Sequence, residues 1–223
     1  MRAVLYIALL CMAGVYVNAK TLGIDLSIFS GAVSKEKFQC LRSHGYNFAI
    51  IQAFNGGRGF NPHAVQNAEN AYAAGMTGVG FYIFACPKCG GNIPASRPID
   101  TVAKGLKGYS KAVRFWIDVE PCNGCWYGST KDNLEYVDGV VTAAMKKFGN
   151  NKVGIYTSKY SWQGVVGSGT KPHFKTLPLW YALYDGKPEF TSINFGGWTK
   201  PYLKQYKGDQ KLCGLDVDYN YLP

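Results

Sequence analysis

The sequence predicts an α/β fold, and more specifically an irregular TIM-like barrel. Apolar, strand-like runs alternate with helix-like segments, which is typical of a parallel sheet with right-handed crossovers. Eight strands can be assigned, and eight is the number that closes a β/α barrel. The chain of 223 residues is short for eight complete units, which indicates that the last three connections lack helices.

An open, doubly wound sheet is the alternative arrangement of the same elements. Sheets of that class commonly bind dinucleotides through a G-x-G-x-x-G turn after the first strand, and no such turn follows "TLGIDLS". No low-complexity linker or block of charge divides residues 20–223. We therefore favour the closed barrel and expect residues 20–223 to form a single catalytic domain.

Residues 1–19 resemble a secretory signal peptide. The stretch "MRAVLYIALLCMAGVYVNA" has a short basic start, an apolar run and a small-residue pattern at its end. The apolar run is too short to cross a membrane, and no comparable run follows it. We expect removal of this leader, no membrane partner, and a protein that is secreted or held in the lumen of a lysosome or phagosome.

The first half of the remaining chain contains three strand–helix pairs. The second helix is bounded by Pro62 near its start and Gly75 just past its end, as helix start and stop signals require. The predicted strands span residues 21–27, 47–54 and 77–85, and the predicted helices span residues 34–44, 62–75 and 96–110.

The second half begins with a fourth strand, "AVRFWIDVE", at residues 112–120. Ser129 then occupies a helix N-cap position with Asp132 three residues later, an acidic variant of the capping box. Apolar residues recur at steps of three and four up to Gly149, which predicts one long amphipathic helix. A fifth strand follows at residues 153–158, and three further strands are predicted at residues 178–185, 202–206 and 214–222.

The cysteine content agrees with export. Six cysteines lie outside the leader, at positions 40, 86, 89, 122, 125 and 213, and six cysteines allow fifteen disulfide pairings. The two C-x-x-C pairs could instead supply four zinc ligands. The 32 residues between Cys89 and Cys122 exceed typical zinc-ribbon spacing, and an oxidising compartment would convert thiolates to disulfides. We favour disulfides and expect neither a metal nor a cofactor.

The formal charge of +10 falls to +9 without Arg2 of the leader. A basic surface attracts anionic polymers such as nucleic acids and bacterial envelopes, although solubility alone could also explain it. The basic residues are scattered along the chain and no nucleic-acid motif is present. We therefore expect no nucleic-acid partner.

The motif "FWIDVE" places Asp118 and Glu120 in an otherwise apolar strand. Alternation along a strand puts both side chains on one face, with Cα atoms roughly 6.5–7 Å apart. They lie at the carboxyl end of the fourth strand, where barrel enzymes carry their chemistry. Asp25 in the first strand and Asp218 in the eighth should face the same mouth, because these strands are neighbours in a closed barrel.

Four clustered carboxylates repel one another, and burial disfavours their ionisation further. One of them is therefore expected to keep its proton near neutral pH. Glycoside cleavage needs a protonated acid beside ionised ones, and Glu120 is our candidate for the acid, with Asp118 assisting. Loop caps, lysine pairs or a calcium or magnesium site are the alternatives. No EF-hand-like loop is present, and the three histidines are not at ligand spacing.

Aromatic residues recur on the strands that surround this acidic motif. Such rings stack on the apolar faces of sugars, although some of them will instead fill the barrel core. The candidate substrate-binding aromatics are Tyr82, Phe84, Tyr156, Trp180 and Tyr184.

Taken in order, these motifs resemble the glycoside hydrolase family 25 lysozymes over essentially the whole of residues 20–223. The resemblance is carried by "GIDLS", "FWIDVE", "VGIYTS", "LWYALYD" and "DVDYNYL". The cysteines, "FYIFACPKC", "FGGW" and "KQY" are similar to the branch found in amoebae, nematodes and other eukaryotes. The motif "KQY" adds Gln205 to the candidate substrate-binding residues.

The resemblance implies a barrel of five β/α units followed by three strands. It also implies cleavage of the β-1,4 bond between N-acetylmuramic acid and N-acetylglucosamine in bacterial peptidoglycan. We expect the protein to be a monomer. Glu120 matches the family's proton donor, Asp118 its partner acid, and Asp25 and Asp218 the acids of the first and last strands. Asp216 competes with Asp218 for that last position, and the following Tyr-Asn-Tyr favours Asp218. The family is thought to retain anomeric configuration through attack by the substrate's own acetamido group.

Two other functions remain open at this point. A non-catalytic wall-binding or signalling module could use the same barrel, although loss of Asp118 or Glu120 would have been its signature. A chitinase would also carry acids on the fourth strand, but its longer D-x-x-D-x-D-x-E run is absent from "AVRFWIDVE".

Overall fold

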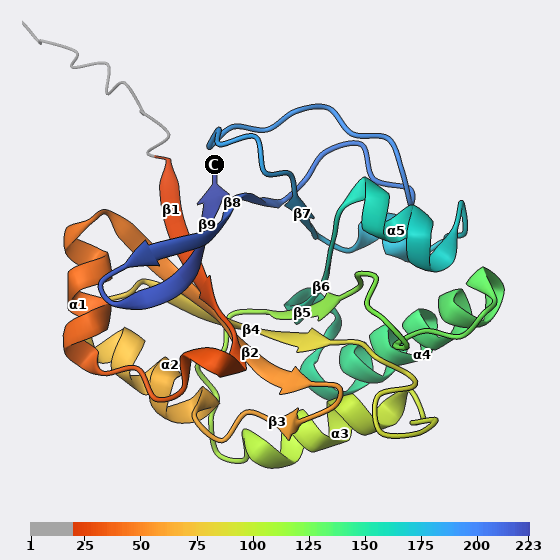
Figure 1. Cartoon of the computed structure of the whole chain (residues 1–223), viewed down its shortest axis with the longest axis horizontal. Coiled ribbons are helices and arrows are strands. Elements are labelled where there is room, and N and C mark those ends of the chain that lie inside the picture. The colour runs from red at the N-terminus through yellow and green to blue at the C-terminus, as the bar shows by residue number, and fades with distance from the viewer. Residues whose placement is uncertain (1–19) are drawn as a thin grey trace, which may run out of the picture.

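Eight strands of the computed structural model, which describes residues 20–223, close into a barrel (Figure 1). The predicted leader, residues 1–19, lies outside the described residues. The strands follow the order β1-β9-β8-β7-β6-β5-β4-β2, and pairing of β1 with β2 closes the ring. A two-residue strand, β3 (Gly59–Phe60), extends the β2 edge. The barrel strands are β1 (Thr21–Leu26), β2 (Tyr46–Asn55), β4 (Gly78–Phe84), β5 (Phe115–Asp118), β6 (Val153–Thr157), β7 (Leu179–Ala182), β8 (Leu203–Leu212) and β9 (Leu215–Leu222).

Five helices surround the barrel, one after each of its first five strands (Figure 1). Serine side chains at positions 34, 129 and 158 cap three of them by accepting a backbone N–H from the first turn, which satisfies one of the donors left free at a helix start. The helices are α1 (Lys35–Ser43), α2 (Ala64–Ala73), α3 (Ser96–Gly105), α4 (Thr130–Phe148) and α5 (Lys159–Val166), with short 3-10 turns at Ile28–Ser30, Asn150–Lys152 and Phe174–Thr176. Within residues 20–223, no helix is both long and apolar enough to cross a membrane.

This arrangement confirms the predicted barrel of five β/α units followed by three strands. Helix α5 is not among the helices predicted from apolar spacing, and it completes the fifth unit. The expectation of a wholly parallel sheet is wrong for the last strand, because β9 runs antiparallel to both β8 and β1. Only Cys213 and Gly214 connect β8 to β9, both with positive φ, and a two-residue turn can make a hairpin but not a crossover.

The fourth barrel strand is shorter than predicted and ends at Asp118. The chain stays extended beyond it, since Val119 N–H still donates to Tyr156 O (2.9 Å). Pro121 then ends the pairing, because proline has no N–H and keeps the preceding residue extended. Glu120 therefore lies just beyond the sheet, at the mouth of the barrel, rather than within a strand.

The apolar core has two layers separated by the sheet. The larger layer fills the space between the barrel and its helices, and the smaller one lies inside the barrel. The inner cluster consists of Ile50, Trp116, Tyr156, Trp180 and Leu203, with Tyr82 packed against it. This aromatic interior closes the floor beneath the acidic residues, so the barrel is a filled core and not a pore.

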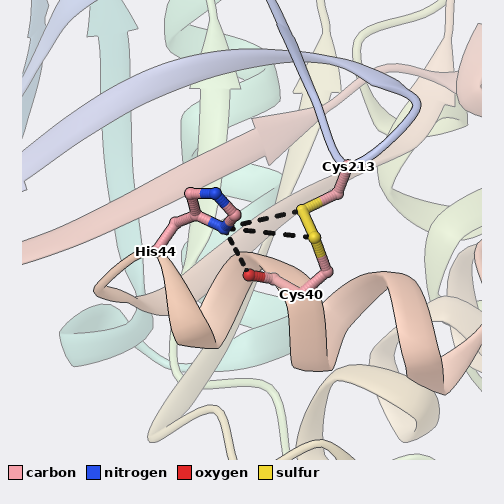
Figure 2. A group of neighbouring side chains, drawn as sticks. All are labelled: Cys40, His44 and Cys213. Carbon is pink, nitrogen blue, oxygen red and sulfur yellow. Dashed lines mark hydrogen bonds between the residues drawn. A yellow bond between two sulfur atoms is a disulfide. The ribbon is translucent and has the colours of Figure 1, made fainter.

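Three disulfides are present: Cys40–Cys213, Cys86–Cys89 and Cys122–Cys125. The first joins α1 to the turn of the β8–β9 hairpin, and His44 Nδ1 lies 2.8 Å from Cys40 O beside the sulfurs (Figure 2). It spans 173 residues of sequence, so it restricts the unfolded chain far more than the two local pairs do. The hairpin that carries Asp218 is thereby tied to the first helix.

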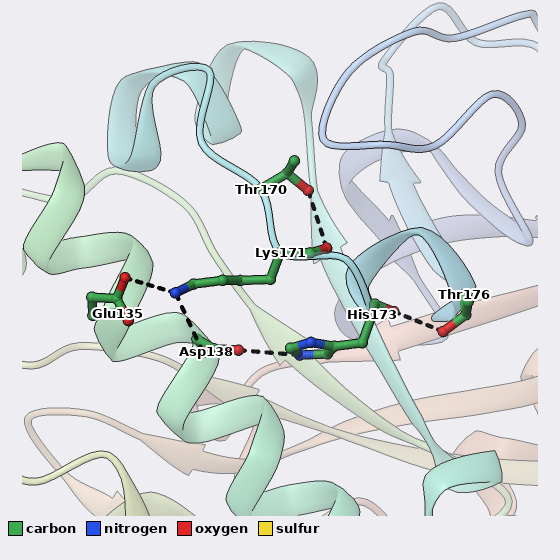
Figure 3. A network of polar contacts seen from close by, with 6 residues as sticks. All are labelled: Glu135, Asp138, Thr170, Lys171, His173 and Thr176. Atoms are coloured by element: carbon green, nitrogen blue, oxygen red, sulfur yellow. Dashed lines mark hydrogen bonds and ion pairs between the residues drawn. The ribbon is translucent and has the colours of Figure 1, made fainter.

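A polar network holds the segment before β7 against α4 (Figure 3). Lys171 Nζ lies 2.7 Å from Glu135 Oε1, and His173 Nε2 lies 3.1 Å from Asp138 Oδ1. Thr176 Oγ1 donates to His173 O (2.7 Å) and closes the turn. These contacts fix the path of the chain into the short strand that carries Trp180.

Candidate active site

The four predicted acids converge at the carboxyl end of the barrel. Asp25 of β1 lies directly opposite Asp218 of β9 in the antiparallel register, so both side chains project from the same face. Asp118 ends β5, and Glu120 follows it two residues later. All four line one cavity of about 110 Å³.

Five of the six predicted substrate-binding residues line the same cavity, namely Tyr82, Tyr156, Trp180, Tyr184 and Gln205. Phe84 does not line it. Its position is paired with Asp118 in the β4–β5 register, but its half-buried ring is not part of the wall. Two larger hollows, of about 260 and 800 Å³, involve Arg114 and Tyr202, and no acidic residue lines either of them. The four acids therefore gather in the smaller cavity.

Gln205 is the centre of the hydrogen-bond network in this cavity. Its amide nitrogen donates to Asp25 Oδ2 (2.8 Å) and Asp218 Oδ2 (3.2 Å). Its amide oxygen accepts from the hydroxyls of Tyr156 (2.7 Å) and Tyr184 (2.8 Å). Because the two tyrosines can only donate to the oxygen, they orient the amide with its N–H groups toward the two carboxylates. Gln205 thus contacts residues of four different strands or loops.

Asn220 belongs to the same network and is absent from the sequence-based site. Its amide donates to Asp25 Oδ2 (2.8 Å) and accepts from Trp180 Nε1 (2.7 Å). Alternation along the last strand could have found it, since residues 218 and 220 project from one face. By the same rule Asp216 is a candidate, but it lies near the turn, exposed and ion-paired with Lys211. The structure therefore selects Asp218 over Asp216.

Burial and mutual repulsion raise the pKa of Asp25 and of Asp118 well above the usual aspartate range. For Asp25, the cost of burial is the largest cause, followed by the charge of Asp218, while the amides of Asn220 and Gln205 act in the opposite direction. For Asp118, burial again comes first, followed by the charges of Glu120 and Asp25. Asp118 Oδ1 is buried and has no hydrogen-bond partner in the described residues, so its capacity to accept a hydrogen bond is unused.

The pKa of Glu120 and that of Asp218 are also raised. Burial is the larger cause for Glu120 and the charge of Asp218 is the second. For Asp218 burial raises the pKa, whereas the hydrogen bond from Asp209 N–H (2.7 Å) lowers it. The backbone carbonyl of Glu120 accepts from Trp126 Nε1 (2.8 Å), which anchors the residue past the end of β5. Four acids with raised pKa values retain protons to higher pH than ordinary carboxyls, which is what general-acid catalysis requires.

Two groups of side chains in residues 20–223 are close enough to share a metal ion, and both consist of cysteines with or without a histidine. The four acids are not among them.

Comparisons with known proteins find relatives over most of this chain. A family model described as "Lysozyme-like protein 1" matches residues 18–206. The chain is 39% identical over 203 residues to a probable GH family 25 lysozyme 3 of Dictyostelium discoideum, covering 90% of this chain but only 41% of that protein. It is 33% identical over 209 residues to lysozyme-like protein 5 of Caenorhabditis elegans, covering 93% and 94% of the two chains.

A solved structure shares the fold. The family GH25 lysozyme of Aspergillus fumigatus superposes with a TM-score of 0.74 at 21% identity, covering 92% of this chain and 94% of that one. The predicted resemblance to the amoeba and nematode branch is confirmed by the sequence relatives. This chain belongs to the glycoside hydrolase family 25 lysozymes.

Proposed function

We propose that this protein is an exported lysozyme that hydrolyses the β-1,4 bond between N-acetylmuramic acid and N-acetylglucosamine in bacterial peptidoglycan. The observation that carries the proposal is the convergence of Asp25, Asp118, Glu120 and Asp218 on one aromatic-lined cavity. The leader-like residues 1–19, the disulfides and the basic charge support export and contact with an anionic wall.

In the first step Glu120 donates its proton to the glycosidic oxygen as the bond from that oxygen to C1 breaks. The acetamido oxygen of the same sugar attacks C1 and forms a cyclic oxazolinium ion. Asp118, which lines the cavity, accepts the acetamido N–H and so fixes the attacking group. The negative charges of the cluster stabilise the positive charge that develops at C1.

In the second step a water molecule attacks C1 and transfers a proton to the Glu120 carboxylate. The C1 bond to the acetamido oxygen breaks, and the amide and the protonated Glu120 are regenerated. Two displacements at C1 leave its configuration unchanged, so the product is formed with retention. Gln205 and Asn220 keep Asp25 and Asp218 in place throughout, because their amides hold both carboxylates.

The test is digestion of purified peptidoglycan by the mature protein, with analysis of the released muropeptides. We expect new muramic acid reducing ends, and chitin oligomers supplied in parallel should remain intact. Glu120→Gln should lower turnover by about 10²–10⁴-fold, the usual contribution of a general acid, while binding persists. Glu69→Gln, which removes an exposed glutamate paired with Lys111, is the matched control and should be fully active. Cleavage of chitin alone, or unchanged activity of Glu120→Gln, would contradict the proposal.

A further inference from the structure

Four cysteines from two separate loops gather beside the active site. Cys86 and Cys89 lie in the loop after β4, and Cys122 and Cys125 lie in the loop after β5. The strands β4 and β5 are paired neighbours, so the long sequence gap between the two C-x-x-C pairs disappears in space. The sulfurs of Cys86, Cys89 and Cys125 all lie within 4.8 Å of one another, and Cys122 is bonded to Cys125.

The two disulfides of this cluster contribute little to stability by restricting the unfolded chain. Each closes a sequence separation of 3 residues, and the entropy removed from the unfolded chain grows with loop length. The Cys40–Cys213 bond, by contrast, spans 173 residues. Structural zinc sites are often formed by four cysteines. Two C-x-x-C pairs from neighbouring loops supply that set of ligands.

The geometry between the pairs agrees with that interpretation. Zinc–sulfur bonds of about 2.3 Å in a tetrahedron place the sulfurs roughly 3.8 Å apart, and Cys89 Sγ lies 3.9 Å from Cys125 Sγ. Within the pairs the Cα atoms are 5.4 and 5.5 Å apart, so side-chain rotation can separate the two sulfurs once their bond is reduced. The loop backbones are already joined, since Lys88 N–H donates to Cys125 O (3.0 Å).

A tight turn and two cationic side chains lie around Cys89. The segment "CPKCGG" turns sharply after Cys89, with Gly90 at φ 82°, a conformation that glycine adopts without strain. Arg58 and Arg97 line a hollow of about 280 Å³ together with Cys89. The loop after β2 packs tightly on the cluster, because a Cβ on Gly56 would lie 2.5 Å from Cys86 Cβ.

We propose that Cys86, Cys89, Cys122 and Cys125 form a four-thiolate zinc site in the reduced protein and two disulfides in the oxidised protein. Two molecules of a dithiol reductant supply four electrons and four protons, open both S–S bonds and become disulfides themselves. The four thiols then bind one Zn²⁺ and release up to four protons. The ion joins the loops after β4 and β5, and Trp126, next to Cys125, holds the Glu120 carbonyl, so the site stabilises the segment that carries the acid.

The experiment uses the mature protein reduced under anaerobic conditions and titrated with Co²⁺ and then Zn²⁺. We expect one ion per chain, the ligand-field absorption of tetrahedral cobalt with four thiolates, loss of that absorption when zinc displaces cobalt, and a higher thermal midpoint with zinc. Cys89→Ser should lose the four-thiolate spectrum. His44→Ala is the matched control, because it removes a ligand from the other cysteine–histidine group, and its spectrum should be unchanged.

Thiol counting and native mass spectrometry complete the test without relying on any variant. The reduced wild-type protein should show the zinc adduct, and the oxidised protein should show none. Absence of metal binding by the fully reduced folded protein would overturn the proposal. So would resistance of these four cysteines to reduction, or an unchanged cobalt spectrum in Cys89→Ser. None of these readouts depends on lysozyme activity, so the zinc site and the enzymatic proposal can fail separately.

Discussion

Asp25 and Asp218 face each other across the β1–β9 pairing, and one amide, that of Gln205, donates to both carboxylates at 2.8 and 3.2 Å. Burial and then the charge of Asp218 raise the pKa of Asp25, and the Gln205 amide partly offsets them. Burial also raises the pKa of Asp218. After burial, the charge of Asp218 is also the second cause that raises the pKa of Glu120, so Asp218 acts on both acids.

Removing the charge of Asp218 should shift the pH dependence of the enzyme. The charge of Asp218 raises the pKa of Glu120, so in Asp218→Asn the acid loses its proton at lower pH and the alkaline limb of the activity profile moves to lower pH. Because the acids titrate together, this limb reports an apparent value for the cluster. The measurement is kcat/KM on soluble muropeptide substrates across pH, with the Glu120 carboxyl followed by infrared spectroscopy.

Asp100→Asn is the matched control for that shift. It removes the same charge at an exposed position of α3, away from the four acids, so its alkaline limb should remain at the wild-type position. An alkaline limb in Asp218→Asn that stays in place, with an unchanged Glu120 infrared titration, would show that the two acids are not coupled.

Replacing Asp118 by Asn should stabilise the protein while it impairs catalysis. The folded-state pKa of Asp118 is raised by burial, so folding becomes less favourable as pH rises through it, and the neutral amide avoids that penalty. We expect a gain of about 1 kcal/mol at pH 7, typical of relieving a strained functional position. The gain should vanish below the unfolded-state pKa of about 3.9, where the wild-type acid is protonated in both states.

Urea denaturation at several pH values measures this effect. Asp100→Asn, a change at an exposed position of α3, is the control and should change stability by less than about 0.5 kcal/mol. Equal stability of Asp118→Asn and wild type at pH 7 would mean that the buried carboxyl is better solvated than its burial implies.

Removing the side chain of Gln205 should impair turnover more than folding. Gln205→Ala leaves Asp25 and Asp218 without their shared donor and Tyr156 and Tyr184 without their acceptor. We expect kcat to fall by about 10²-fold, the cost of a small misplacement of catalytic groups, with a smaller change in KM. Gln163→Ala, at an exposed position of α5, should retain wild-type kinetics. A loss confined to KM would assign Gln205 to binding alone.

Salt should weaken attack on intact cell walls more than attack on short soluble fragments. The basic charge of the chain attracts an anionic polymer over distances that ions screen, with a Debye length of about 10 Å at 0.1 M and about 3 Å at 1 M. The measurement compares hydrolysis rates on purified cell walls and on neutral soluble oligosaccharides between about 0.1 M and about 1 M salt. It separates electrostatic attraction to the wall from the rate of bond cleavage. If both rates respond equally, the charge serves solubility and not wall binding.

The sequence by itself determined much of the fold and most of the site. Alternating apolar patterns and capping residues such as Ser129 specify strands and helices because these depend on neighbours a few residues apart. Asp25, Asp118 and Glu120 could be selected because each lies at the carboxyl end of a predicted strand. In a barrel of parallel strands these ends all lie on the same side.

Only the tertiary structure decided features that depend on residues distant in the chain. The direction of β9 and the inclusion of Asn220 follow from how the final hairpin pairs with β1. The exclusion of Phe84 follows from which side chains of the neighbouring strands line the cavity. The meeting of the two C-x-x-C pairs likewise requires β4 and β5 to be neighbours. The physical reason is that local propensity has a range of one helical turn or strand, whereas register, burial and charge repulsion arise between segments that folding alone brings together.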